Sequence, residues 1–130
     1  MSSIFSKIVA GEIPAYKVAE STEFLAFLDI APLVEGHLLV IPKKEVDKLF
    51  ELDDETYAGL MIFAKIVATA MKKAIPCNRI GVTVIGLEVP HAHIHLIPIN
   101  GLLDMTFTRP KLKFTEEEFQ AIADKIKAEL

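Results

Sequence analysis

The chain has 130 residues, of which 52% are hydrophobic and 25% are charged, and its formal net charge is −4. This length suits a single domain over residues 1–130, and the apolar content is high enough for a real core, which argues against a disordered chain. The acidic balance argues against a general nucleic-acid-binding protein, because such proteins usually present a basic face. The lone cysteine, Cys77, cannot form an internal disulfide and fits a reducing compartment.

No segment has the character of a membrane span or of a signal peptide. The least charged stretch, residues 80–103, contains Glu88, three histidines and two prolines, which are costly to bury in lipid. The first residues lack a basic region followed by an apolar one. We therefore expect a cytoplasmic protein that has no membrane partner.

The first third of the chain predicts a short helix and three strands. Ser3 is expected to cap a helix from Ile4 to about Ala10, which ends at Gly11. Two β runs at residues 16–20 and 24–28, separated by a polar turn, predict a hairpin. Residues 37–41 then predict a buried third strand.

The rest of the chain predicts a long helix, two strands and a C-terminal helix. Apolar residues recur with a 3.6-residue period from Tyr57 to Met71, which predicts a helix of about five turns. Residues 80–85 and 89–99 predict two strands joined through Gly86, and a capping-box pattern at Thr115 opens a helix over about 115–130. The expected fold class is α+β, with a mostly antiparallel five-stranded sheet, one long helix and short flanking helices.

Three of the four histidines alternate with apolar residues at His91, His93 and His95. On a strand, alternate side chains share one face, so the three imidazoles are expected on one side and the apolar residues on the core side. A single histidine such as His37 is most simply a hydrogen-bonded, half-buried residue. Three imidazoles together have no packing advantage over valine, so the pattern indicates a functional site.

Two chemistries fit the histidine strand, and the spacing alone favours neither. Zinc can take two or three ligands from such a strand and keep an open position for water. Alternatively, one histidine can act as a nucleophile in phosphoryl or nucleotidyl transfer while the others orient the substrate and protonate a leaving group.

The sequence also resembles a known family. Residues 91–97 match the pattern His-φ-His-φ-His-φ-φ, with φ apolar, of the histidine triad (HIT) nucleotide hydrolases and transferases, and the chain resembles their Hint-like branch. Residues 4–15, 25–32 and 36–43 resemble the family's upstream blocks, in the same order and at the same spacing. The resemblance covers roughly residues 3–98.

The resemblance implies a HIT-like fold and an enzyme acting at the α-phosphate of purine nucleoside phosphate derivatives, of the phosphoramidate or dinucleoside polyphosphate type. It assigns His93 as the nucleophile that forms a nucleotidyl-histidine intermediate. His95 and His37 would contact the phosphate oxygens, and His91 would support the site. It implies no cofactor and no catalytic metal, and a homodimer formed through the long helix and the histidine-bearing strand.

The resemblance extends to the nucleoside site. Asp29 stands where the family uses a carboxylate to hold the ribose hydroxyls, although an aspartate at a strand end also commonly caps a turn. The residues that stand where the family encloses the base are apolar, and without the motif they would be read as core: Phe5, Phe27 and Ile30.

Two departures from the family carry expectations of their own. Ser3, Ser6 and Glu45 occupy positions where some members hold a structural zinc with two cysteines and a histidine, so we expect no structural zinc. The loop before the triad, which holds phosphate in the family, carries Glu88 and Val89 in place of the usual side-chain donors. An ionised Glu88 can only accept hydrogen bonds. We expect it to turn away from the phosphate and pair with a histidine or a lysine, because in an unbroken strand it lies on the face opposite His91. The alternative is that Glu88 stays in the site, protonated or hydrogen-bonded to water, and serves a leaving group that carries a positive charge or a hydroxyl.

These departures keep two other functions open. A protein that retains the pocket but has lost efficient turnover would be a nucleotide-binding module. A zinc-dependent hydrolase would use the three histidines as ligands.

Overall fold

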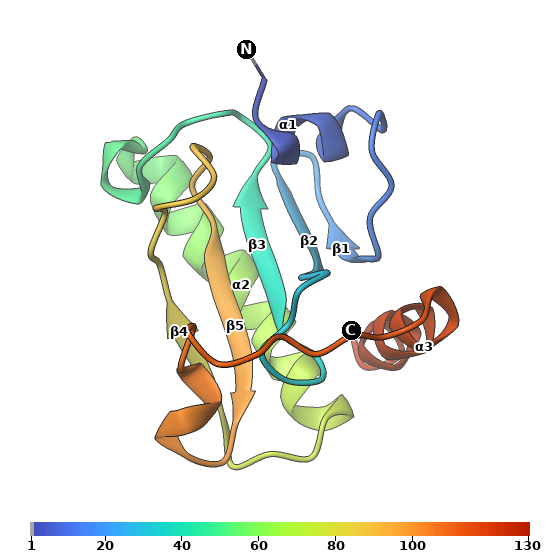
Figure 1. The fold of residues 1–130 in the computed structure, drawn as a ribbon. Coiled ribbons are helices and arrows are strands. Elements are labelled where there is room, and N and C mark those ends of the chain that lie inside the picture. The colour runs from blue at the N-terminus through green and yellow to red at the C-terminus, as the bar shows by residue number, and fades with distance from the viewer. Residues whose placement is uncertain (1) are drawn as a thin grey trace.

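The structure is a computed structural model that describes residues 2–130 (Figure 1). Its helices are α1 (Ile4–Val9), α2 (Asp54–Ala74) and α3 (Glu116–Lys127), with short 3₁₀ turns η1 (Leu49–Glu51) and η2 (Leu102–Met105). The strands are β1 (Lys17–Glu20), β2 (Phe24–Leu28), β3 (Leu38–Pro42), β4 (Arg79–Thr83) and β5 (Ile94–Ile99). They form one sheet in the order β1-β2-β3-β5-β4, in which every neighbouring pair is antiparallel. The expected α+β fold is confirmed.

The helices begin where side chains can accept the first unpaired backbone N–H groups. The Ser3 hydroxyl accepts from the Ser6 N–H at 3.0 Å, and the Asp53 carboxylate accepts from the Thr56 N–H at 3.1 Å. At α3, Thr115 and Glu118 form the expected reciprocal capping box. The 3₁₀ turns were not anticipated, because a single short turn leaves no periodic pattern.

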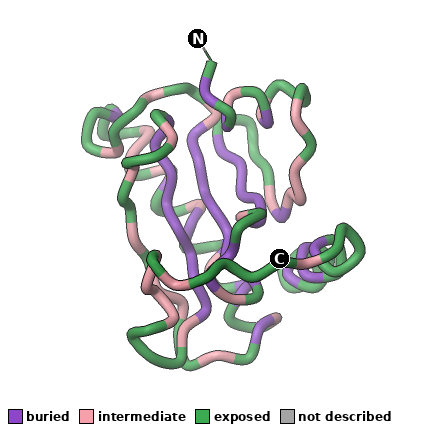
Figure 2. The backbone as a smooth tube through the Cα atoms, viewed as in Figure 1, coloured by how far each residue is buried: buried purple, intermediate pink, exposed green. Residues whose placement is uncertain are grey.

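Strand alternation gives the sheet two different faces. Even-numbered residues of β2, β3 and β5, such as Ala26, Val40 and Ile94, pack in the core beneath α2 and α3. Odd-numbered residues such as Phe27 and Leu39 face α1 on the other side. Figure 2 shows that these central strands are buried along most of their length. Because α1 has only six residues, it covers part of its face and leaves room for a pocket beside it.

The histidine strand is shorter than the sequence predicts. β5 begins at Ile94 rather than at residue 89, and β4 ends at Thr83 rather than at residue 85. Gly86 has a φ of 74°, which turns the chain, and Pro90 has no N–H to offer a ladder. His91 and His93 therefore lie at the end of a loop, and only His95 lies on the strand.

β5 is also an interior strand, because β3 and β4 flank it. The edge strands are β1 and β4, so an interface that continues the sheet would use one of these strands rather than the histidine-bearing strand. No described helix is both long and apolar enough to cross a membrane.

Candidate active site

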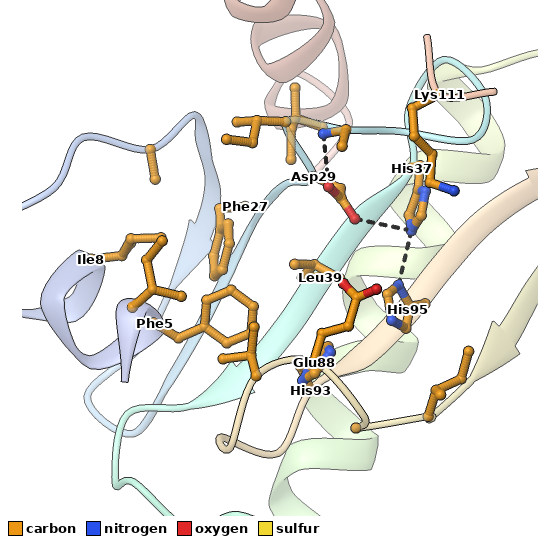
Figure 3. Close-up of a pocket in the computed structure, with 18 of the residues that line it drawn as sticks. Phe5, Ile8, Phe27, Asp29, His37, Leu39, Glu88, His93, His95 and Lys111 are labelled. Carbon is orange, nitrogen blue, oxygen red and sulfur yellow. Dashed lines mark hydrogen bonds and ion pairs between the residues drawn. The ribbon is translucent and has the colours of Figure 1, made fainter. Parts of the chain in front are cut away.

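A cavity of about 520 Å³ opens on the face of the sheet that carries α1. It gathers residues from α1, from the ends of β2 and β3, from the 84–93 loop and from the segment after η2 (Figure 3). Nine of the ten residues expected at the site line it: Phe5, Phe27, Asp29, Ile30, His37, Glu88, Val89, His93 and His95. His91 does not; its side chain is fully buried behind the pocket wall.

The hydrogen bond made by His93 fixes which of its nitrogens is available. Its Nδ1 lies 2.7 Å from the backbone carbonyl oxygen of His91. A carbonyl oxygen only accepts, so Nδ1 carries the hydrogen, and in the neutral ring the lone pair lies on Nε2. The imidazole is held further by edge-on packing against Phe5, with ring centroids 5.1 Å apart. Nε2 of His93 therefore presents a lone pair of fixed orientation to the pocket.

His37 and His95 form a second hydrogen-bonded pair. The Leu33 N–H donates to His37 Nδ1 at 3.0 Å, so the neutral ring carries its hydrogen on Nε2. That Nε2 donates to His95 Nδ1 at 2.9 Å, which leaves the hydrogen of His95 on its own Nε2. His95 therefore offers a donor where His93 offers an acceptor.

Burial keeps these rings neutral. It lowers the pKa of His37 to about 4 and the pKa of His95 to about 3, and it also lowers the pKa of His91. Asp29 opposes the effect at His37, because its Oδ2 lies 3.6 Å from Nε2. Near pH 7 His37, His91 and His95 therefore act through the direction of their hydrogen bonds rather than through positive charge.

Asp29, His37 and His95 each offer a ligand atom within 4.8 Å of the others, a spacing that would allow all three to bind one metal ion. The atom that His37 would use is Nε2, which carries a hydrogen because Nδ1 accepts from Leu33. Metal binding would move that hydrogen to Nδ1, where it would oppose the Leu33 N–H. The donor set fits a hydrogen-bonded relay better than a zinc centre.

Behind the pocket, Ser3, Ser6 and Glu45 meet around His91. The Ser3 hydroxyl lies 2.8 Å from His91 Nδ1, and His91 Nε2 donates to the Pro42 carbonyl at 2.7 Å. Glu45 accepts from the Ser3 N–H at 2.7 Å and from the Ser6 hydroxyl at 2.6 Å. These contacts join α1, the end of β3 and the loop that carries His93.

This cluster does not fit zinc. It contains no thiolate, its hydroxyls are neutral, and the Nδ1 of His91 is already hydrogen-bonded to Ser3. In this protein, hydrogen bonds rather than a metal ion link α1, the end of β3 and the loop that carries His93. His91 consequently acts on the pocket through its backbone carbonyl, which orients His93.

Asp29 follows β2 and divides its two carboxylate oxygens between different partners. Oδ1 accepts from the Ala31 N–H at 2.9 Å, which caps the turn after the strand. Oδ2 is directed at His37 and lines the pocket. The turn-capping alternative is therefore correct for one oxygen, while the other remains available to a ligand.

The apolar residues expected around the base also have two roles. Phe5 and Phe27 are buried, pack edge-on with centroids 5.5 Å apart, and belong to the core beneath α1. Both also line the pocket, so the same two side chains belong to the core and form part of the pocket wall. Ile30 is 71% exposed and forms part of the rim.

Glu88 contradicts the preferred expectation for it. Its carboxylate is exposed and points into the pocket toward His95 (Figure 3), and it joins no ion pair within residues 2–130. The expectation assumed an unbroken strand, in which Glu88 would alternate away from the histidines, but residues 84–93 form a loop. In that loop no backbone N–H of residues 86–89 donates to another described backbone carbonyl.

The sequence analysis missed a whole segment of the pocket lining, which contributes Phe107, Thr108 and Lys111. They belong to the segment between η2 and α3, which crosses in front of β5 and β3 (Figure 1) and is tied down by the Leu112 N–H donating to Pro32. Phe107 packs edge-on against His95, with centroids 4.9 Å apart. The available signal was a cluster of cations, Arg109, Lys111 and Lys113, in an otherwise acidic chain.

The chain is similar in sequence and in structure to known proteins. The chain is 38% identical over 136 residues to adenosine 5'-monophosphoramidase hnt1 of Schizosaccharomyces pombe, covering 100% of this chain and 99% of that protein. It is similar in structure, with a TM-score of 0.86 and 34% identity, to a Hit-like protein of Bartonella henselae described as involved in cell-cycle regulation; the match covers 99% and 96% of the two chains.

A zinc-bound histidine triad family protein of Mycobacterium smegmatis is also similar, with a TM-score of 0.81 and 26% identity over 99% of this chain and 93% of that one. The HIT domain family model matches residues 10–101, which include the pocket's histidines, Asp29 and the loop that carries Glu88. The chain therefore belongs to the HIT domain family.

Proposed function

We propose that the protein hydrolyses phosphoramidates of adenosine or a related purine nucleoside 5′-monophosphate. The observation that carries the proposal is the lone pair on His93 Nε2, which the 2.7 Å hydrogen bond from Nδ1 to the His91 carbonyl directs into the pocket. The similarity to a protein named adenosine 5'-monophosphoramidase supports this choice of reaction over hydrolysis of dinucleoside polyphosphates.

The proposed reaction has two displacements at phosphorus. His93 Nε2 attacks the α-phosphorus and forms a P–N bond, while the bond from phosphorus to the leaving amine breaks. The amine departs with that electron pair and takes up a proton. Water then attacks the same phosphorus, the bond to Nε2 breaks, and the nucleoside monophosphate is released with loss of a proton.

The donors for the phosphate oxygens come from two places. His95 is expected to donate from Nε2, because its Nδ1 already accepts from His37. His37 supports that donor rather than binding phosphate directly. The backbone N–H groups of residues 86–89 lack backbone acceptors within residues 2–130 and supply the donors that the side chains of Glu88 and Val89 cannot.

The nucleoside is held by the other half of the pocket. The Oδ2 of Asp29 is the acceptor for the ribose hydroxyls, and Phe5, Phe27 and Ile30 enclose the purine. Phe107 closes the site over His95 from the opposite side.

We further infer a homodimer. α2 exposes Met61, Ile62 and Ile66 on its outer face, and Val82 is 53% exposed on β4, whose edge is open. Pairing two β4 edges would cover these apolar side chains. Ile62→Asp should convert a dimer to monomers in light scattering; an unchanged mass for wild type and variant would contradict this interface.

Turnover of adenosine 5′-phosphoramidate with and without a chelator tests the proposed function. We expect release of ammonia and the monophosphate at the same rate in both conditions, because no step of the proposed reaction uses a metal ion. Loss of activity with chelator would favour the zinc hydrolase. Tight monophosphate binding without turnover would favour a binding module.

A further inference from the structure

Glu88 places a negatively charged carboxylate in a pocket that is proposed to bind a negatively charged phosphate. It lines the same cavity as His93 and His95, and its carboxylate points toward His95 (Figure 3). No described lysine, arginine or histidine pairs with it. An anion in the pocket opposes binding of a substrate whose only charge is negative.

The other charged groups of the pocket do not offset Glu88. Asp29, after β2, is a second carboxylate. Burial lowers the pKa of His37 to about 4 and that of His95 to about 3, so neither supplies positive charge near pH 7. Lys111 is the cation among the lining residues, and its ammonium donates to the backbone carbonyls of Phe107 and Arg109. It acts on His37, whose pKa it lowers, rather than pairing with Glu88.

The surroundings of Glu88 are apolar. Its neighbour Leu87 is 89% exposed, Ile85 is 45% exposed, and both line the pocket. This part of the rim therefore combines hydrocarbon surface with one unpaired carboxylate. An alkyl chain that ends in an ammonium group matches both features.

We propose that Glu88 selects leaving amines that carry a second, positively charged amino group on a short alkyl chain. The inference rests on the proposed phosphoramidase function and specifies its leaving group. One nitrogen of the diamine is bonded to phosphorus; when that P–N bond breaks, it leaves with the electron pair and takes up a proton. The distal ammonium keeps its charge throughout and pairs with the Glu88 carboxylate.

The test compares two adenosine phosphoramidates whose chains have the same shape. One is made from cadaverine and ends in an ammonium group; the other is made from hexylamine and ends in a methyl group. For the wild type we expect kcat/KM to favour the cationic substrate by about three- to tenfold, the range of a partly exposed charge pair, and added salt to reduce this ratio. Glu88→Gln should bring the ratio close to one.

Glu51→Gln is the matched control, because Glu51 is an exposed carboxylate in η1 that does not line the pocket. It should keep the wild-type ratio. An equal ratio in wild type and Glu88→Gln would overturn the selection by Glu88 while leaving the phosphoramidase function intact. Failure of the wild type to cleave either substrate would instead overturn the proposed function, and the selection with it.

Discussion

The backbone carbonyl oxygen of His91 accepts the Nδ1–H of His93 at 2.7 Å, so the first triad histidine orients the second through its main chain. The imidazole of His91 points the other way, to Ser3 and Pro42. The first two histidines of the motif therefore have different roles. His93 presents a lone pair to the pocket, and His91 holds in place the loop that carries His93.

His93→Ala should abolish turnover. Removing a covalent nucleophile costs several powers of ten in kcat, whereas removing a supporting side chain costs far less. His91→Ala keeps the orienting carbonyl and should retain measurable activity while lowering the melting temperature. Steady-state kinetics and thermal unfolding of both variants check this. A mild loss for His93→Ala beside a severe loss for His91→Ala would reverse the assignment.

Ser3→Ala tests the link behind the pocket. It leaves the buried Nδ1 of His91 without its hydroxyl partner, which should cost about 1–3 kcal/mol in the free energy of unfolding. We expect kcat to fall with little change in KM, because His93 becomes less well oriented while the nucleoside contacts remain. Ser6→Ala is the control, since the Ser6 hydroxyl lies farther from His91, at 3.4 Å. Equal effects of the two substitutions on kcat would contradict the role of Ser3.

Asp29→Asn should weaken nucleotide binding by roughly 1.5–3 kcal/mol, the range of a charge-assisted hydrogen bond. The amide can still accept from the Ala31 N–H, so the turn should survive. Calorimetry with adenosine 5′-monophosphate and its 2′,3′-dideoxy analogue measures the contact. If the wild type binds both ligands equally, Asp29 serves the turn and not the ribose.

Stability should fall as the pH is lowered from about 6.5 toward 4. In this range unfolded histidine takes up a proton, whereas burial keeps His37 and His95 neutral until their pKa values of about 4 and about 3 are reached. The unfolded state then binds more protons, so each residue costs on the order of 1–2 kcal/mol by pH 5. Chemical denaturation should give a shallower pH dependence for His95→Gln. An identical slope for wild type and variant would show that His95 does not titrate in this way.

Periodicity and capping signals predicted most of the fold, because they depend on neighbours in sequence. Ser3 and Thr115 mark the starts of α1 and α3, as the sequence predicts. The predicted start of β5 at residue 89 was wrong, because Gly86 turns the chain and Pro90 has no N–H to pair, whereas the histidine alternation continues through this loop. That error also misplaced Glu88, whose orientation was inferred from an unbroken strand.

The motif identified nine residues that line the pocket but could not supply the segment that closes it. Phe107, Thr108 and Lys111 reach the site because residues 106–114 cross the sheet, and no local pattern reports such a crossing. The sequence also could not predict that the two carboxylate oxygens of Asp29 have different partners, because it does not show which oxygen caps the turn.

The stereochemistry at phosphorus tests the central claim most directly. The substrate is an adenosine 5′-phosphoramidothioate of one phosphorus configuration, hydrolysed in isotopically labelled water. Two in-line displacements, first by His93 Nε2 and then by water, each invert phosphorus, so the account predicts overall retention of configuration. Inversion would mean a single direct attack by water and would contradict a nucleotidyl-histidine intermediate.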